Sequence, residues 1–399
     1  MTAATEVCRE IPSRQELVRR AADLVPLLRK NARQTDRGRR IPEENLEALE
    51  EAGLLRLTRP RRYGGYEIDA LTKYEVLSEL ARGCASTSWV TMIYTDVSFI
   101  IGKFPDDVQD EVFSDPRVRA TGTLVPTGQA VRVDGGFRVN GQWRFNTGSL
   151  HAQWVFEPAV VEFEPGQPEV CIFLMRWTEL EIIDDWFVSG LRGTGSNSAV
   201  ARDVFVPENR VLRFVDLIEN RSKSSENKGS HLYAIPAVPF VFTSGGSHLA
   251  GVAKAALESF LERAGSRPIT YTGYERKSDA AVTHLQVAEA SLNIAATDHL
   301  MREASAILDH HAATGAPWGP EEMPRIWGIV SYTTRLCAEA VETIRRAAGA
   351  SAINDSDPLE LIARDAGALS AHAAMMPTTG LEHYGRSLCG LPPTTPLLL

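Results

Sequence analysis

The chain has 399 residues, of which 44% are hydrophobic and 23% are charged. A chain of this length exceeds what a single hydrophobic core usually organises, so we expect two or three packed domains. Its 42 Lys and Arg residues against 51 Asp and Glu residues give a formal charge of −9, which argues against a general binder of nucleic-acid phosphates.

The sequence has no segment that predicts export or membrane insertion. No stretch approaches about 18 uninterrupted apolar residues, and the N-terminus lacks the apolar core of a signal peptide. Five cysteines lie far apart without a Cys-x-x-Cys pair, which argues against a disulfide framework or a zinc site: Cys8, Cys84, Cys171, Cys337 and Cys389. We therefore expect a cytoplasmic protein with free thiols, no membrane span and no metal site.

Residues 13–115 have apolar side chains at the three- and four-residue spacing of helices. Pro42 followed by two acidic residues predicts a helix start, because proline fits the first turn and carboxylates complement the positive helix end. Tyr63, Gly64 and Gly65 interrupt the pattern, and helical periodicity resumes over residues 70–101.

Residues 119–215 change to short runs that alternate between apolar and polar side chains. Asp134-Gly135-Gly136 predicts a hairpin, and Asn140-Gly141 predicts a second turn a few residues later. Further strands are expected over residues 154–162, 170–175 and 199–206. This region is predicted to be an all-β domain.

The polar residues 220–230 predict an exposed loop. Four long periodic segments follow it, over residues 237–264, 280–313, 324–348 and 357–376, and they are typical of a four-helix bundle. The predicted fold is mainly α with a central β-domain, divided into an N-terminal helical domain (1–118), a β-domain (119–218) and a C-terminal helical bundle (219–399).

This order of domains resembles the acyl-CoA dehydrogenase superfamily, whose β-domain is a barrel or sandwich. Segments that carry the resemblance occur along nearly the whole chain: residues 40–42 (RIP), 53–55 (GLL) and 63–65 (YGG), then 141–148 (GQWRFNTG), 190–197 (GLRGTGSN), 204–207 (VFVP) and 364–365 (RD). The resemblance implies a homotetramer that binds a flavin.

Within the superfamily the chain looks like the two-component flavin-dependent monooxygenases. Residues 84–90 (CASTSWV), residues 185–197 and His372, seven residues after Asp365, carry this likeness. Dehydrogenases need a carboxylate to remove the α-proton of a thioester. One usual site for it holds Ala373, and the other, on the first bundle helix, is covered by residues 231–257, which contain no Asp or Glu.

No Gly-x-Gly-x-x-Gly motif follows a strand and opens a helix, so a nicotinamide site is not evident. A separate NAD(P)H:flavin reductase that supplies reduced FMN or FAD is the simplest arrangement. The resemblance implies that O2 then forms a C4a-hydroperoxyflavin, which hydroxylates an aromatic or polycyclic small molecule. The alternatives are an amino-sugar N-oxygenase, an acyl-CoA dehydrogenase and an inactive scaffold of the same fold.

His372 is the first catalytic candidate, because an imidazole deprotonates a phenol or an amine and returns a proton near neutral pH. The resemblance places Thr147 at the hydroxyl that contacts flavin N5, with Asn146 as the adjacent polar candidate. It also implies further cofactor contacts: Thr123 at the pyrimidine edge, Trp186 as a wall of the flavin site, and Arg276 and Gln286 reaching the cofactor of a neighbouring subunit.

One position departs from the pattern of relatives that act on phenols or thiophenes. Those proteins often carry a histidine on the helix after the Ser-Thr-Ser-Trp segment, where this chain has Val97. Asp96 or Tyr94 is a candidate to take its place, or the substrate is not a simple phenol.

Overall fold

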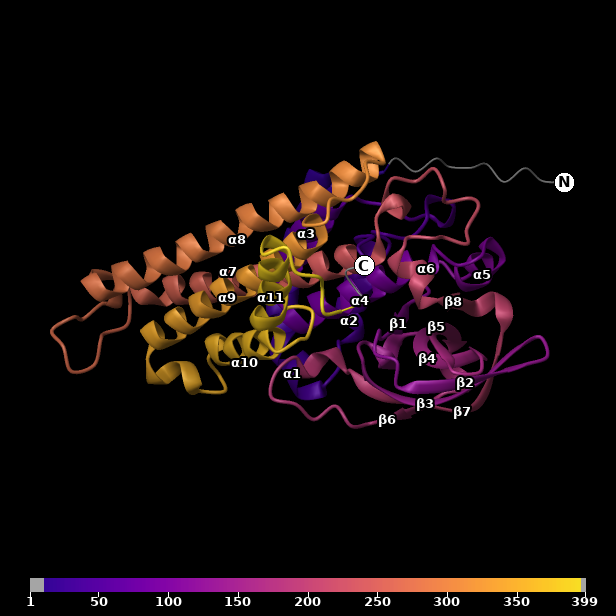
Figure 1. The fold of residues 1–399 in the computed structure, drawn as a ribbon. Coiled ribbons are helices and arrows are strands. Elements are labelled where there is room, and N and C mark those ends of the chain that lie inside the picture. The colour runs from indigo at the N-terminus through magenta and orange to yellow at the C-terminus, as the bar shows by residue number, and fades with distance from the viewer. Residues whose placement is uncertain (1–10, 396–399) are drawn as a thin grey trace.

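The computed structural model describes residues 11–395 and contains a helical half and a β-rich half (Figure 1). Cys8 lies outside the described residues, and within them the cysteines are unpaired, as predicted. Among the described residues, no helix has the length and apolar character needed to cross a bilayer. The helices are α1 (Arg14–Gly38), α2 (Glu43–Glu51), α3 (Ala70–Gly83), α4 (Ala85–Ile101), α5 (Asp106–Val112), α6 (Phe214–Ile218), α7 (Ala237–Ala264), α8 (Ala281–Thr314), α9 (Glu322–Ala348), α10 (Pro358–Ser370) and α11 (Pro377–Leu388).

The β-rich half is one eight-stranded sheet in the order β6-β7-β3-β2-β4-β5-β8, with β1 paired in parallel to β4. Its strands are β1 (Ala120–Gly122), β2 (Gly128–Val133), β3 (Gly136–Asn146), β4 (Trp154–Glu164), β5 (Gln167–Arg176), β6 (Glu181–Ile183), β7 (Asn197–Pro207) and β8 (Val211–Arg213). Its apolar side chains form a core of their own, which includes Trp143, Val155 and Phe173.

The predicted fold class is confirmed. The helix start at Pro42 is confirmed as well, since this residue caps α2. The hairpin at Asp134–Gly136 joins β2 to β3. The predicted loop over residues 220–230 has no regular secondary structure, but it is not exposed throughout, because Ser224 and Asn227 are buried. In Figure 1, α7, α8 and α9 run alongside one another, and α7 packs against α3 in the N-terminal half.

Two predicted helical segments differ in the structure: the first is divided and the second is shorter than predicted. Residues 70–101 form two helices, because Cys84 adopts an extended conformation between them. The predicted helix over residues 357–376 ends at Ser370, and α11 follows. Pro377 explains part of this break, because a proline disfavours helical backbone at the residue before it, and Met376 has ψ 121°. His372 therefore lies in a turn between two helices.

The predicted turn at Asn140-Gly141 is wrong, because β3 continues through both residues. The pairing of β3 with β7 shifts register at this point, as it does at a β-bulge. The Asn140 Oδ1 atom accepts a hydrogen bond from the backbone N–H of Asp203, which has φ 55°. The Asn-Gly pair thus marks a bulge instead of a chain reversal.

Candidate functional site

The site is built around the irregular end of β3. The pairing of β3 with β7 shifts register between Trp143 and Asn146, and Phe145 there has φ 68°. Such backbone costs energy in a residue with a side chain and occurs most often where function requires it. Here it leaves the Phe145 ring 60% exposed while Asn146 and Thr147 remain buried.

A row of buried hydroxyl groups begins at Thr147. Its Oγ1 atom lies 2.8 Å from Oγ of Ser196, which lies 2.7 Å from Oγ1 of Thr194. Thr194 Oγ1 donates to the carbonyl oxygen of Leu191 at 2.8 Å. The predicted cofactor contact is thus one end of a hydrogen-bonded chain.

The loop after β6 brings Trp186 to the same place. Its indole N–H donates to the Leu191 carbonyl at 3.1 Å, and its ring meets the Phe145 ring edge-on at 5.8 Å. The predicted wall residue is therefore half-buried in a loop beside Thr147 and is not part of the core of the sheet. Phe187, next to it, is 68% exposed.

Asp365 of α10 fastens this loop to the helical half. Its Oδ1 atom accepts from the backbone N–H of Leu191 at 2.7 Å, and Leu191 has a left-handed φ of 53°. Burial raises the pKa of the Asp365 carboxyl to about 7.

The side chain of Asn146 faces the interior of the sheet. Its amide nitrogen donates to the Trp143 carbonyl at 3.1 Å, and its Oδ1 atom has no hydrogen-bond partner among the described residues. Glu157 of β4 is fully buried nearby, and burial raises the pKa of its carboxyl well above the ordinary value, although the Asn146 amide opposes the shift. Glu157 was not predicted, and the only signal was one acid in the apolar run of β4.

Thr123 lies in the loop that follows β1. Its hydroxyl accepts a hydrogen bond from the backbone N–H of Val125 at 3.1 Å. Two residues earlier, the Thr121 hydroxyl donates to the carbonyl oxygen of Thr147. The structure thus brings Asn146, Thr147 and Trp186 into one region, and Thr123 follows two residues after the Thr121 contact with Thr147.

His372 lies in the turn after α10 and packs against α4. The His372 ring meets Trp89 at 5.0 Å, and His248 contacts the same indole at 5.0 Å. Nδ1 of His372 accepts from the backbone N–H of Ala374 at 3.3 Å, so the neutral ring carries its proton on Nε2. Surrounding protein atoms lower the pKa of His372 to about 4 by desolvation, although the residue is exposed at the surface of the turn.

Helix α4 connects this histidine region to Thr147. Five residues after Trp89, the Tyr94 hydroxyl donates to the Gly148 carbonyl at 2.7 Å. Gly148 has φ 72°, and a Cβ atom there would lie 2.5 Å from the Tyr94 oxygen. Glycine is therefore required both by the backbone and by the close approach of α4.

Arg276 and Gln286 do not join the site within one chain. Arg276 is exposed at the end of the α7–α8 loop and pairs with Asp279 at 2.9 Å. Gln286 lies near the start of α8. In Figure 1 this end of the bundle is remote from the β-strands.

Comparisons with known proteins identify the family. The acyl-CoA dehydrogenase N-terminal domain model matches residues 13–116, and the acyl-CoA dehydrogenase C-terminal domain model matches residues 245–377. The chain is 32% identical over 379 residues to HsaA from Rhodococcus jostii, the oxygenase subunit of a flavin-dependent monooxygenase, which covers 93% of this chain and 97% of that protein. This chain belongs to the family of flavin-dependent monooxygenase oxygenase components.

Two further relatives agree. The oxygenase is 30% identical to the oxygenase component of the FADH2-dependent resorcinol hydroxylase from Rhizobium, over 94% of this chain and 95% of that protein. The structure of XiaF from Streptomyces in complex with FADH2 and glycerol superposes with a TM-score of 0.90 at 31% identity, over 96% of this chain and 97% of that one.

Tyr94 and Asp96, the two candidates to replace the histidine that relatives carry at the position of Val97, both form contacts inside the protein. Tyr94 is bonded to Gly148, as described above. Asp96 forms a buried ion pair with Lys73 and accepts from the Ser244 hydroxyl at 3.4 Å. Burial raises the pKa of Asp96 to about 6, against the effect of the ammonium group, and one of its oxygens has no partner within the described chain.

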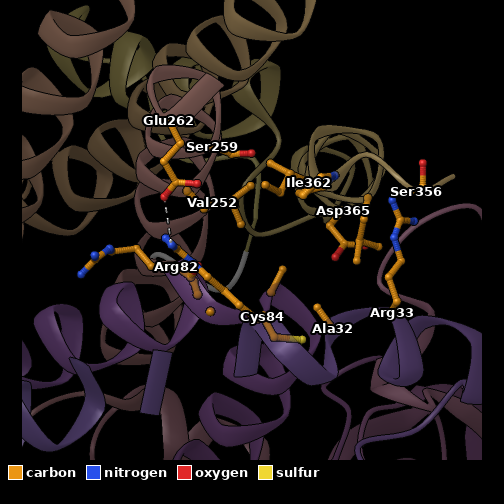
Figure 2. Close-up of a pocket in the computed structure, with 17 residues that line it drawn as sticks. Ala32, Arg33, Arg82, Cys84, Val252, Ser259, Glu262, Ser356, Ile362 and Asp365 are labelled. Atoms are coloured by element: carbon orange, nitrogen blue, oxygen red, sulfur yellow. Dashed lines mark hydrogen bonds and ion pairs between the residues drawn. The ribbon is translucent and has the colours of Figure 1, made fainter. Parts of the chain in front are cut away.

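A cavity of about 200 Å³ lies between α1, the α3–α4 junction, α7 and α10, and Figure 2 shows the side chains around it. Cys84, Val252, Ile362 and Asp365 line it. It is smaller than the roughly 300–1,000 Å³ of most small-molecule sites. The seven predicted site residues of the oxygenase, all within the described chain, lie elsewhere.

Proposed function

We propose that this oxygenase hydroxylates an aromatic or polycyclic small molecule with reduced FMN or FAD from a separate NAD(P)H:flavin reductase. The single observation that carries the proposal is the position of Thr147, a buried hydroxyl beside the exposed ring of Phe145 and the half-buried ring of Trp186, which α4 connects to His372. Two relatives, an oxygenase subunit of a flavin-dependent monooxygenase and the oxygenase component of an FADH2-dependent resorcinol hydroxylase, support it.

The residues present fit a flavin. Phe145 and Phe187 expose 60% and 68% of their surfaces, which suits the apolar face of a planar ring system, and the Thr147 hydroxyl follows two residues after Phe145. Thr147 would hold the N5 edge, Thr123 the pyrimidine edge, and Trp186 one wall. Reduced flavin supplies the activation of O2.

The role we assign to His372 is proton transfer with the substrate. Its low pKa makes the ring neutral near pH 7, so Nδ1, the ring nitrogen without a proton, can take a proton from a phenol hydroxyl. The indole of Trp89 supplies an apolar face beside the histidine for an aromatic substrate. The loop at Trp186 and the buried end of β3 would exclude water from the region around Thr147.

We also propose that the oxygenase is a homo-oligomer, and the family resemblance implies a tetramer. Arg276 and Gln286 would then contact the cofactor of a neighbouring copy. An apolar stripe on the exposed face of α8 supports a second copy as its partner. Val282, Leu285 and Leu292 on this stripe are 52%, 73% and 70% exposed. Several exposed apolar side chains on one helix are typical of a subunit interface.

The stripe offers a direct test by sedimentation. Leu285→Glu and Leu292→Glu should dissociate the assembly, because each buries a charge in the interface. Val131→Glu on strand β2, where the side chain is 67% exposed, is the matched control and should leave the assembly intact. A wild-type monomer at working concentration would contradict the proposal.

The function is tested by supplying the two components separately. The pure chain with NADH and a panel of phenols should neither oxidise NADH nor form product. Addition of an NADH:flavin reductase with FMN or FAD should start O2-dependent hydroxylation of at least one phenol. Robust NADH oxidation by the chain alone, or a tightly bound oxidised FAD that acyl-CoA reduces, would overturn the proposal.

A further inference from the structure

The hydroxyl chain that ends at Thr147 has a fixed direction. The Leu191 carbonyl at its far end has no proton, so the 2.8 Å contact requires Thr194 to donate. A hydroxyl has a single proton, and Thr194 has then used its own. The 2.7 Å contact between Ser196 and Thr194 must therefore be donated by Ser196.

The same reasoning identifies the donor at Thr147, the other end of the hydroxyl chain. Because Ser196 has given its proton to Thr194, the 2.8 Å contact between Thr147 and Ser196 must be donated by Thr147. The Thr147 hydroxyl thus has no proton left for a ligand. It can offer only a lone pair, so it accepts hydrogen bonds from outside and cannot donate them.

We propose that Ser196 and Thr194 are positioning residues that hold the Thr147 hydroxyl as an acceptor, and that the site thereby selects the reduced flavin over the oxidised one. The inference rests on the proposed function. N5 of a reduced flavin carries a hydrogen and is a donor, whereas N5 of an oxidised flavin has only a lone pair. A hydroxyl that can only accept a hydrogen bond therefore binds N5–H of the reduced flavin, and it is repelled by the lone pair on N5 of the oxidised flavin.

The surrounding structure preserves the direction of the hydrogen bonds along the hydroxyl chain. Thr147, Thr194 and Ser196 are 4%, 2% and 4% exposed, so water has little access to reverse the donors. Leu191, which supplies the terminal carbonyl, is held in its left-handed conformation by Asp365. The backbone N–H of Gly148 also donates to the Thr194 carbonyl at 2.8 Å, which joins the two segments.

The test is the ratio of dissociation constants for oxidised and reduced FMN, measured anaerobically, together with the same ratio for FAD. In Ser196→Ala the Thr147 proton is released and can turn toward N5, so oxidised flavin should gain and reduced flavin should lose affinity. The ratio should fall by about 3- to 10-fold, as expected for one hydrogen bond. Thr194→Val should also lower this ratio. Ser196 is then free to donate to Thr147, which releases the Thr147 proton for N5.

Ser149→Ala is the matched control. Ser149 is also buried, at 2% exposed, and donates to the neighbouring Gly195 carbonyl at 2.9 Å, but it is not a member of the chain. This variant should keep the wild-type ratio. Thermal unfolding of all three variants separates a loss of selectivity from a loss of folded protein, and Thr194→Val provides the test if Ser196→Ala does not fold.

The outcomes distinguish this inference from the function on which it rests. A wild-type protein that binds neither redox state of either flavin overturns both. A wild type that binds reduced flavin, with Ser196→Ala and Thr194→Val unchanged in their ratio, overturns only the role of the hydroxyl chain. An equal fall in all three variants shows a general loosening of the site and also contradicts the inference.

Discussion

Replacement of His372 by alanine should separate catalysis from stability. The structural loss is limited mainly to one edge-on ring contact with Trp89 at 5.0 Å, which is worth about 0.5–1.5 kcal/mol beyond the buried area. The loss of a general acid–base group should slow product formation by about 10²–10⁴-fold. Reduced-flavin affinity should change little, and O2 consumption should be diverted from product to hydrogen peroxide.

The pH dependence follows from the lowered pKa of His372. With a pKa of about 4, the ring is neutral across the range above about pH 5 and protonated below pH 4. The coupling of O2 consumption to product should therefore be flat from about pH 5 to 8 and fall as the pH approaches 4. A histidine with its ordinary pKa near 6.5 would place the fall more than two pH units higher.

The assay measures product and hydrogen peroxide per O2 consumed, with reduced-flavin affinity and thermal stability measured on the same samples. His383→Ala is the matched control, because this histidine is 6% exposed and stacks on Trp327 at 4.8 Å. It should lose stability and keep its coupling. A His372→Ala protein with unchanged coupling and an unchanged oxygenation rate would refute the assigned role.

Two further predictions concern buried charges. Lys73→Met leaves Asp96 buried without its ion-pair partner and should lower the free energy of unfolding by about 3–5 kcal/mol, whereas Lys73→Met/Asp96→Leu should restore most of it, as denaturant titration will show. Asp365 has a folded pKa of about 7 against an ordinary 3.8, so the folded state binds its proton more tightly and stability falls as the pH rises from 4 to 7. Asp365→Asn should remove this part of the pH dependence, and equal slopes of unfolding free energy for both proteins over that range would contradict it.

The sequence predicted the elements whose signal is local. The helix start at Pro42 and the hairpin at Asp134–Gly136 depend on backbone preferences of a few neighbouring residues, and both are present. The break before α11 had a local signal in Pro377, but the helical spacing of apolar residues obscured it.

The parts that were not predicted depend on distant contacts. Asn140-Gly141 has the composition of a turn, and the pairing of β3 with β7 makes it a bulge. The hydroxyl chain joins Thr147 to residues about fifty positions later, which no spacing rule connects. Glu157 is a single acid in an apolar strand, and its burial follows only from the packed sheet.

The most direct test of the central claim is an anaerobic titration of the protein with reduced FMN and reduced FAD, followed by mixing with O2 and a phenolic substrate. We predict tight binding of at least one reduced flavin, weaker binding of the same flavin when oxidised, and formation of a hydroxylated product that requires O2. A protein that binds oxidised flavin more tightly than reduced flavin, or that reoxidises bound reduced flavin without forming product from any substrate of the panel, would contradict the account.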